Sequence, residues 1–200
     1  MKRGERIGIT IEHFYNTAKR HAKMYNPYGV TCQAIQETSE PGQGPFKSEL
    51  AVKHNNFGGI KCKRFWLQAG RDCTFLVSDE EIDGKKAPVR SSFRVYRNLD
   101  DYLECLNDKF LEPGTNYQVV VKEKNCFWLH FAGLYFGGWA TDSGYFAALC
   151  DHAVALAPRL LGPKGPEHIR TAFAYALTKN ILQQWMVKEI KRALEGRKRK

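Results

Sequence analysis

Apolar residues recur every three or four positions along most of the chain, the period of a helix with one buried face. Ile11, Phe14, Ala18 and Ala22 show the pattern near the start. One stretch, 127–136, is apolar nearly all round, as expected for a central buried helix. The pattern predicts helices over residues 10–25, 28–38, 99–111, 127–136, 142–156 and 167–194.

The middle of the chain departs from the helical period. Thr74–Val77 and Ser92–Tyr96 have the composition of strands, and Asp83-Gly84 between them is a turn signal. These residues predict a small antiparallel hairpin. The expected fold is therefore α+β and mainly helical, with one β-hairpin lobe.

Two hundred residues with 43% hydrophobic content are enough for a globular domain with a real core. The segment 162–166 is rich in Gly and Pro, so we expect a main domain over 1–162 and a basic, amphipathic helical extension over 163–200. The formal net charge of +10 favours polyanionic partners such as an acidic cell wall, an anionic lipid surface or nucleic acid.

Several classes of protein are disfavoured. There is no run of about 18 apolar residues that would span a membrane, and the first residues lack the apolar stretch of a secretory signal, so synthesis in the cytoplasm is expected. The six cysteines form no C-x-x-C pair and no zinc-ligand spacing. We therefore expect no metal, no cofactor and, in a cytosolic setting, reduced thiols.

Glu37 is the residue that fits its surroundings least. It shares a helix face with Val30 and Ala34, in the last turn before a Pro/Gly-rich segment. An apolar face and the negative end of a helix both raise the pKa of a carboxyl group. A carboxylic acid kept protonated near neutral pH is what a glycosidase needs. A glutamate that turns to solvent or pairs with a lysine fits the helix spacing at least as well.

The hairpin offers a second acidic group. Asp79, Glu80 and Glu81 form a cluster on one arm, and in glycoside hydrolysis a second carboxylate activates water or stabilises the positive charge on the sugar. A solvated hairpin tip is the alternative. Sugar rings stack on aromatic faces, and Trp66 and Trp139, beside glycines or polar loops, are the best aromatic candidates.

Together these pieces resemble the glucosaminidase domain of glycoside hydrolase family 73, found in bacterial autolysins and in the muramidase domain of flagellar rod-cap proteins. The resemblance extends over about residues 8 to 160, and it depends on the order and spacing of several short motifs. The motifs are Gln33–Ser39, Ser48–Ala51, Asn55–Cys62, Ser92–Tyr96 and Gly138–Tyr145.

The resemblance implies a lysozyme-like fold and hydrolysis of the β-1,4 bond from N-acetylglucosamine to N-acetylmuramic acid in peptidoglycan. The catalytic acid of the family falls on Glu37. The second acid of the family lies in a Thr-x-Glu element, and Ser78-Asp79-Glu80 occupies that place, which favours Glu80. The motifs and the aromatic candidates give a predicted substrate-binding set of Asn55, Asn56, Trp66, Tyr96, Trp139, Asp142 and Tyr145, although Asp142 also fits as a helix cap.

The chain departs from the family pattern at three places. The usual Gly-Trp-Gly after the acid is replaced by the longer segment 39–44. Gly58 stands where the family has phenylalanine, and Trp139 stands where it has tyrosine.

We therefore expect a monomeric endo-β-N-acetylglucosaminidase whose partner is the peptidoglycan glycan strand, and we expect no nucleic acid among its partners. It would act on the wall after non-standard export or phage release, with the basic helix over 183–200 contacting anionic wall polymer or lipid. Two alternatives stay open. One is a lytic transglycosylase or muramidase on the same fold, and the other is a non-catalytic basic protein that binds the wall or nucleic acid.

Overall fold

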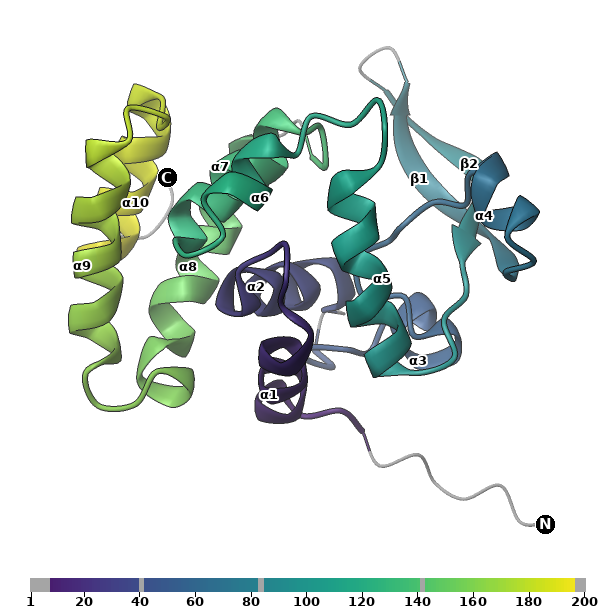
Figure 1. Ribbon diagram of the computed structural model, residues 1–200, viewed down its shortest axis with the longest axis horizontal. Helices are drawn as coiled ribbons and strands as arrows, with labels where there is room; N and C mark the ends of the chain where they lie inside the picture. Colours follow the sequence, from purple (N-terminus) through teal and green to yellow (C-terminus); the bar gives the residue numbers. More distant parts are fainter. Residues whose placement is uncertain (1–7, 40–41, 83–84, 141–142, 197–200) are drawn as a thin grey trace.

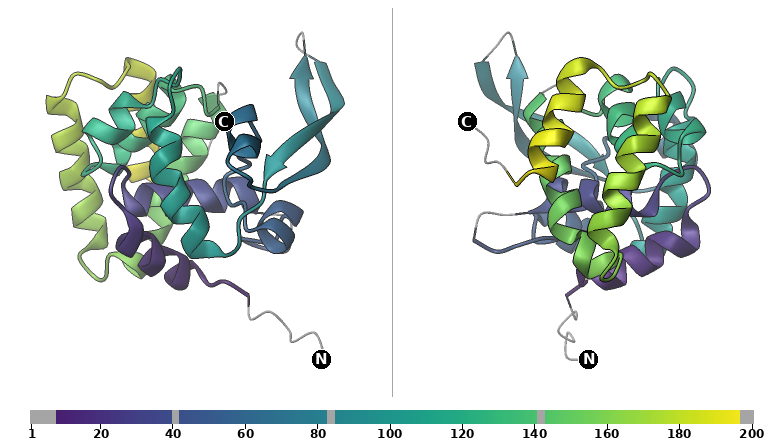
Figure 2. Two further views of the ribbon diagram at one scale, coloured as in Figure 1. Left: turned by 45° about the vertical axis from the view of Figure 1, so that its right-hand side comes forward. Right: turned by 90° about the vertical axis from the view of Figure 1, so that its left-hand side faces the viewer.

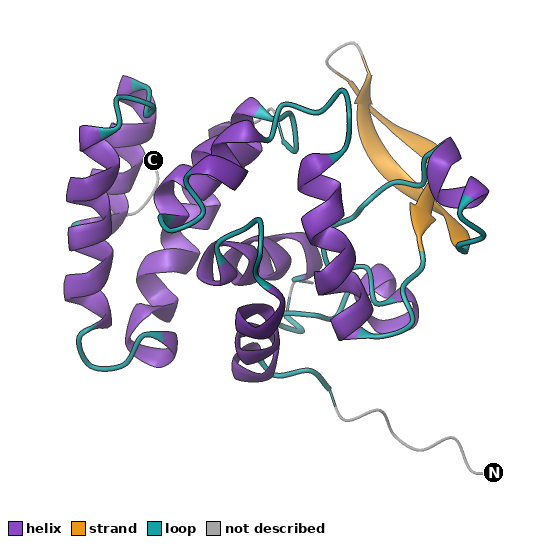
Figure 3. Cartoon of the chain, in the orientation of Figure 1, coloured by secondary structure: helices purple, strands orange, loops and turns teal. Residues whose placement is uncertain are grey.

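The computed structural model describes residues 8–39, 42–82, 85–140 and 143–196. For residues 78–82 and 85–86 it describes the backbone but not the side chains. Over these residues a body of helices carries a two-stranded antiparallel sheet at one side, so the expected mainly helical α+β fold is confirmed (Figures 1 and 3). The elements are α1 (Ile11–His21), α2 (Pro27–Thr38), α3 (Glu49–His54), α4 (Arg64–Gln68), β1 (Cys73–Ile82), β2 (Lys85–Arg94), α5 (Leu99–Leu111), α6 (Gln118–Lys122), α7 (Phe127–Phe136), α8 (Ser143–Leu160), α9 (Gly165–Thr178) and α10 (Gln184–Leu194).

Helices α2 and α7 form the centre of the core. The side chain of Asn26 caps α2 by accepting a hydrogen bond from the backbone N–H of Gly29 at 2.9 Å, and Pro27 occupies the first helical turn. All residues of α7 from Phe127 to Leu134 are buried, as its apolar composition predicts. A Cβ added at Gly29 would lie 2.7 Å from Cδ2 of His130, so the glycine allows α2 and α7 to approach closely.

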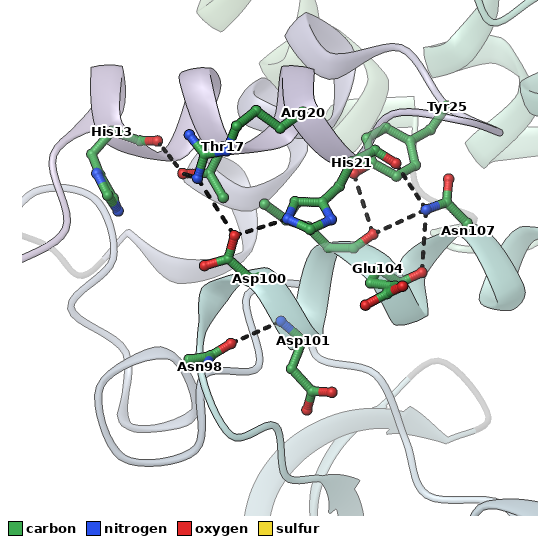
Figure 4. Close-up of polar contacts among 11 residues, drawn as sticks. His13, Thr17, Arg20, His21, Tyr25, Asn98, Asp100, Asp101, Glu104 and Asn107 are labelled. Carbon is green, nitrogen blue, oxygen red and sulfur yellow. Dashed lines mark hydrogen bonds and ion pairs between the residues drawn. The ribbon is translucent and has the colours of Figure 1, made fainter.

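Helix α1 packs against α5 through polar groups (Figure 4). His21 Nε2 lies 2.8 Å from the Asp100 carboxylate, and Asn107 donates from Nδ2 to the carbonyl of His21 at 3.0 Å. The Asn107 carbonyl oxygen accepts from the backbone N–H groups of Lys23 and Met24 at 3.0 and 2.9 Å. These bonds satisfy backbone groups just past His21, where α1 ends, four residues before the expected boundary.

The hairpin is longer than the sequence pattern indicated. Its register runs from Cys73 opposite Arg94 to Ile82 opposite Lys85, so the acidic cluster is part of β1. The hairpin and α9–α10 lie on opposite sides of the molecule, with α5 beside the base of the hairpin (Figures 1 and 2).

The expectation of reduced thiols is wrong for one pair of cysteines. Cys62 and Cys73 form a disulfide, with their Cα atoms 6.2 Å apart. The chain between them contains α4. Cys62 directly follows Lys61, which forms an isolated antiparallel bridge with Phe93, and Cys73 is the first residue of β1, so the fold brings the two cysteines together. That contact depends on the tertiary fold and has no signature in the cysteine spacing. The other cysteines, Cys32, Cys105, Cys126 and Cys150, are buried and free.

The C-terminal segment forms two helices where one was expected over 167–194. Helix α9 ends at Thr178, and the left-handed backbone of Asn180, with φ of 54°, turns the chain into α10. Side chains from both helices, among them Ile169 and Met186, belong to the same buried cluster as α7 and α8. In the part of the chain that the structure describes, no helix has the length and apolar character needed to cross a bilayer.

Candidate functional site

Glu37 lies in the last turn of α2, where its side chain is partly buried. Its carboxylate oxygen Oε1 accepts two hydrogen bonds. The hydroxyl of Tyr145, in the first turn of α8, donates at 2.6 Å, and Nε1 of Trp139, which follows α7, donates at 3.0 Å. The structure therefore brings together Glu37, Trp139 and Tyr145, all three named from the sequence.

Burial is the main influence on the Glu37 carboxyl and raises its pKa above the ordinary value of 4.5. The hydrogen bonds from Tyr145 and Trp139 favour the ionised form and oppose this rise, but the net direction is upward. The pKa of Tyr145 is also raised, by burial first and then by the neighbouring carboxylate, so the phenol stays protonated and acts as a donor. The site thus holds an acid that keeps its proton to higher pH than a free glutamate.

A glycine pair brings the backbone close to this carboxylate. Gly59 has a left-handed φ of 59°, and a Cβ on it would lie 3.6 Å from Oε2 of Glu37. A Cβ on Gly58 would lie 2.8 Å from the Tyr102 hydroxyl and 2.9 Å from Cζ2 of Trp139. The space that a larger residue at position 58 would need is therefore taken by Tyr102 and Trp139.

The two asparagines before this pair hold the loop in place. Asn56 is 0% exposed; its Nδ2 donates to the carbonyls of Ile60 and Arg94 at 3.0 and 2.9 Å, and its Oδ1 accepts from the N–H of Ile60 at 2.9 Å. Asn55 has a left-handed backbone and donates from Nδ2 to the carbonyl of Tyr96 at 2.9 Å. These amides were expected to bind substrate. In the structure they form hydrogen bonds with backbone groups of the protein, and these bonds hold the loop beside Glu37 in place.

Trp66 and Tyr96 are packing residues in this structure. Trp66 is 5% exposed, its Nε1 donates to the carbonyl of Asp72 at 2.9 Å, and its ring meets that of Tyr96 edge-on at 5.3 Å. Tyr96 is 2% exposed. The idea that they present a face to a sugar is therefore not supported, because the guanidinium groups of Arg71 and Arg94 lie over the Trp66 ring and Tyr96 packs edge-on against Tyr102 at 5.2 Å.

Two other predicted residues cannot be placed at the level of their side chains. Glu80 is paired with Ala87 in the β1–β2 register, but its side chain lies outside the description. Asp142 lies outside the described residues altogether.

Tyr102 was missed by the sequence interpretation. It is fully buried on α5, and the Glu37 carboxylate contributes to the rise in its pKa, after burial and the neighbouring Tyr96. Its spacing three residues after Leu99 predicts a buried position. Nothing in that spacing indicates that its hydroxyl ends beside Gly58 and Trp139.

The unusual segment after the acid returns to the end of α2. The carbonyl of Thr38 accepts from the backbone N–H groups of Lys47 and Ser48 at 3.0 and 3.1 Å, and its hydroxyl accepts from the N–H of Phe46 at 3.1 Å. The first two bonds satisfy the carbonyl of Thr38, one of the free carbonyl groups of the helix end next to Glu37. Across the described ranges, no group of three His, Cys, Asp or Glu residues is placed to hold a metal ion.

Comparisons with known proteins agree with this architecture at the level of the fold. No protein-family model and no curated protein matches the chain. Among solved structures, the catalytic domain of the autolysin Auto from Listeria monocytogenes is similar, with a TM-score of 0.56 and 20% identity over 72% of this chain and 81% of that one. A mutant peptidoglycan hydrolase from Sphingomonas sp. A1 is also similar, with a TM-score of 0.55 and 18% identity over 81% of this chain and 95% of that one. The lysozyme-like fold expected from the sequence motifs is thus confirmed.

Proposed function

We propose that this protein is a peptidoglycan hydrolase that cleaves the wall glycan by general acid catalysis, with Glu37 as the acid. The observation that carries the proposal is the Glu37 carboxyl itself, whose pKa burial raises while Tyr145 and Trp139 fix one of its oxygens. The names of the structural neighbours, an autolysin and a peptidoglycan hydrolase, support the same class of substrate.

In this mechanism the proton of Glu37 passes to the glycosidic oxygen as the bond to the sugar breaks. The acid becomes a carboxylate at that moment, and the donors on Oε1 stabilise the charge that appears on it. Tyr145 and Trp139 therefore have a positioning role, because they orient the carboxyl and favour its product state. The family has a tyrosine at the position of Trp139. In this chain the indole N–H of Trp139 donates to Glu37, and a phenol hydroxyl donates to it from Tyr145.

The positive charge that develops on the sugar needs a second group. We assign this role to Glu80, on the motif match in the sequence and on its place in β1 opposite Ala87. The finer specificity, an endo-β-N-acetylglucosaminidase cutting after N-acetylglucosamine, follows from the family motifs around Glu37 and Gly138–Tyr145.

The products of digestion test the proposal. Purified protein is incubated with peptidoglycan, and the released muropeptides are reduced and examined by mass spectrometry. We expect fragments that end in reducing N-acetylglucosamine. Ends with reducing N-acetylmuramic acid would indicate a muramidase, and 1,6-anhydro ends would indicate a lytic transglycosylase. Either result would overturn the specificity, and the absence of any cleavage would overturn the proposed activity.

A further inference from the structure

Two polar side chains, one on α2 and one on α7, are buried without a partner in the described part of the chain. Gln33 is 1% exposed and His130 is 0% exposed. Neither the amide of Gln33 nor either ring nitrogen of His130 has a hydrogen-bond partner among the described residues. Buried polar groups in native proteins are almost always hydrogen-bonded to protein or to ordered water. Packing alone therefore does not explain the presence of these two side chains.

Gln33 lies between His130 and Glu37 along α2. Gly29, Gln33 and Glu37 are spaced four residues apart, so they follow one helix face with a rise of about 6 Å from each to the next. The imidazole of His130 lies over the first of these positions, since its Cδ2 is 2.7 Å from the point where a Cβ of Gly29 would be. The row thus leads from His130, past Gln33, to the acid.

Aromatic rings connect His130 to Trp139 on the side of α5 and α7. The ring centroid of Phe110 lies 5.7 Å from that of His130 and 6.0 Å from that of Trp139. Trp139 in turn donates to Glu37. His130, Phe110 and Trp139 therefore form a continuous series of ring contacts that ends at the carboxylate.

Tyr102 is a third buried polar residue, and it lies beside Trp139 at the end of this row that is nearer to Glu37. Its hydroxyl has no partner among the described residues. It lies 2.8 Å from the Cβ position of Gly58, and the ring of Trp139 lies 2.9 Å from that same position. The Tyr102 hydroxyl is thus close to the indole that donates to Glu37.

We propose that Gln33, His130 and Tyr102 are positioning residues that form a polar rear wall, and that ordered water bound by this wall stabilises the Glu37 carboxylate after proton transfer. The inference rests on the proposed role of Glu37 as the acid. His130 serves as a neutral ring, because burial lowers its pKa to about 3, and a neutral imidazole can donate one hydrogen bond and accept another. The amide of Gln33 and the hydroxyl of Tyr102 can do the same, which suits a chain of bridging waters.

Variants that keep the shape but remove the polar atoms test the wall. In Gln33→Met and His130→Phe the carboxylate loses stabilisation, so the pKa of Glu37 rises further and the alkaline limb of the kcat profile moves to higher pH. The plateau value of kcat falls about three- to tenfold, because a weaker acid transfers its proton more slowly. KM stays unchanged, since neither side chain is placed to touch the sugar. If the two side chains contribute to packing alone, the variants will have a changed melting temperature, and the alkaline limb of the kcat profile will stay at the same pH.

A second readout does not depend on turnover. The Glu37 carboxyl is titrated by NMR in protein labelled with ¹³C-glutamate, with Glu37→Gln used to assign its signal. If the wild type fails to cleave peptidoglycan, the proposed function falls, and the titration still tests the wall. Gln36→Met is the matched control, because Gln36 is the preceding residue on α2 and its side chain meets Nε2 of His152 at 3.1 Å.

We expect a higher pKa for Glu37 in Gln33→Met and His130→Phe and an unchanged one in Gln36→Met. A Glu37 pKa equal to that of the wild type in both Gln33→Met and His130→Phe would overturn the proposal. If both lose their cooperative thermal transition, Tyr102→Phe carries the same test with the same two outcomes, since it removes one hydroxyl and keeps the ring.

Discussion

Glu37 accepts two hydrogen bonds at one carboxylate oxygen, and both of them oppose the effect of burial. Burial alone would give an acid that holds its proton firmly and transfers it poorly. Donors that stabilise the carboxylate make the transfer easier while the net pKa stays raised. The balance between these two influences is the property that suits Glu37 to act as a catalytic acid.

Removing the Tyr145 hydroxyl tests this balance. We expect Tyr145→Phe to lower kcat about 10- to 100-fold, because a hydrogen bond to a charged group contributes about 1.5–3 kcal/mol. The loss of a donor also raises the pKa of Glu37, so the alkaline limb of the pH–rate profile moves to higher pH. The control is Tyr175→Phe, an exposed tyrosine whose hydroxyl meets Glu123 at 3.2 Å. Equal activity of the two variants would contradict the role of Tyr145.

The raised pKa of Glu37 also predicts how stability depends on pH. Because this pKa is higher in the folded state than the unfolded value of 4.5, the folded state binds more protons between the two values. The stabilising contribution of Glu37 is complete below pH 4.5 and is lost as the pH rises through the folded pKa. Glu37→Gln, which cannot ionise, should therefore unfold at higher urea concentration than the wild type at pH 8. The two proteins should converge near pH 4, and a constant difference from pH 4 to pH 8 would contradict the shift.

The sequence identified Glu37, Trp139 and Tyr145 because these residues belong to short motifs whose order can be recognised. Its assignment for Trp66 rested on nearness to a loop and that for Tyr96 on the Ser92–Tyr96 motif as well, and neither feature determines whether a ring is exposed. Tyr102 and His130 could not be linked to the acid beforehand, since their positions depend on how α5 and α7 pack against α2.

At the scale of elements, α5 holds the hairpin at two points. Near its start, Asp101 accepts bonds from Arg71, just before β1, at 2.7 Å. Directly after its end, the buried carboxylate of Glu112 pairs with Arg94, the last residue of β2, and with Lys109 at 2.9 Å. The base of the hairpin is thus bonded to both ends of α5. These bonds fix the direction in which β1 extends toward Glu80.

Breaking the buried pair should loosen this attachment. We expect Glu112→Gln to destabilise the fold by about 3–5 kcal/mol, because it leaves Arg94 buried without a countercharge. Glu49→Gln is the control; it removes an exposed pair with Lys53, and such pairs contribute little to stability because water and salt screen them. Urea unfolding compares the two, and hydrogen exchange should locate the added opening in β1 and β2. Equal stability of both variants would show that the buried pair does not hold the hairpin.

The element boundaries show which information the sequence lacks. Helix α5 has the expected bounds because its apolar stripe is regular, and α7 has them because its apolar run is continuous from one end to the other. The break between α9 and α10 was missed, since the apolar pattern continues across Asn180 while the backbone there turns left-handed. The short helices α3, α4 and α6 have too few residues to show a period.

The whole molecule is held together by one core that reaches the last helix. Trp128 of α7 donates from Nε1 to the carbonyl of Ile169 at 3.0 Å, and Arg192 of α10 bonds Asp151 of α8 at 2.7 Å. The segment expected as an extension therefore covers the apolar helices on the far side from the hairpin.

Truncation after Gly162 should consequently abolish folding. Ile169, Phe173, Met186 and Ile190 are buried, and each contributes about 1.5–3 kcal/mol, which together approaches the total stability of about 5–15 kcal/mol of a typical domain. We expect no cooperative thermal transition in the truncated protein. Lys188→Glu with Lys191→Glu is the control, because both lysines are exposed on α10 and their charge can change without loss of core contacts. A truncated protein that melts cooperatively would contradict the shared core, and weaker wall binding by the charge variant would support a contact through α10.

The central claim is that Glu37 supplies the proton for glycosidic cleavage, and the turnover of purified peptidoglycan by Glu37→Gln tests it most directly. The amide keeps an acceptor for Tyr145 and Trp139 but has no proton to give, so the account predicts a folded protein whose kcat is lower by about 10²–10⁴-fold. A folded Glu37→Gln protein that cleaves the glycan at the rate of the wild type would contradict it.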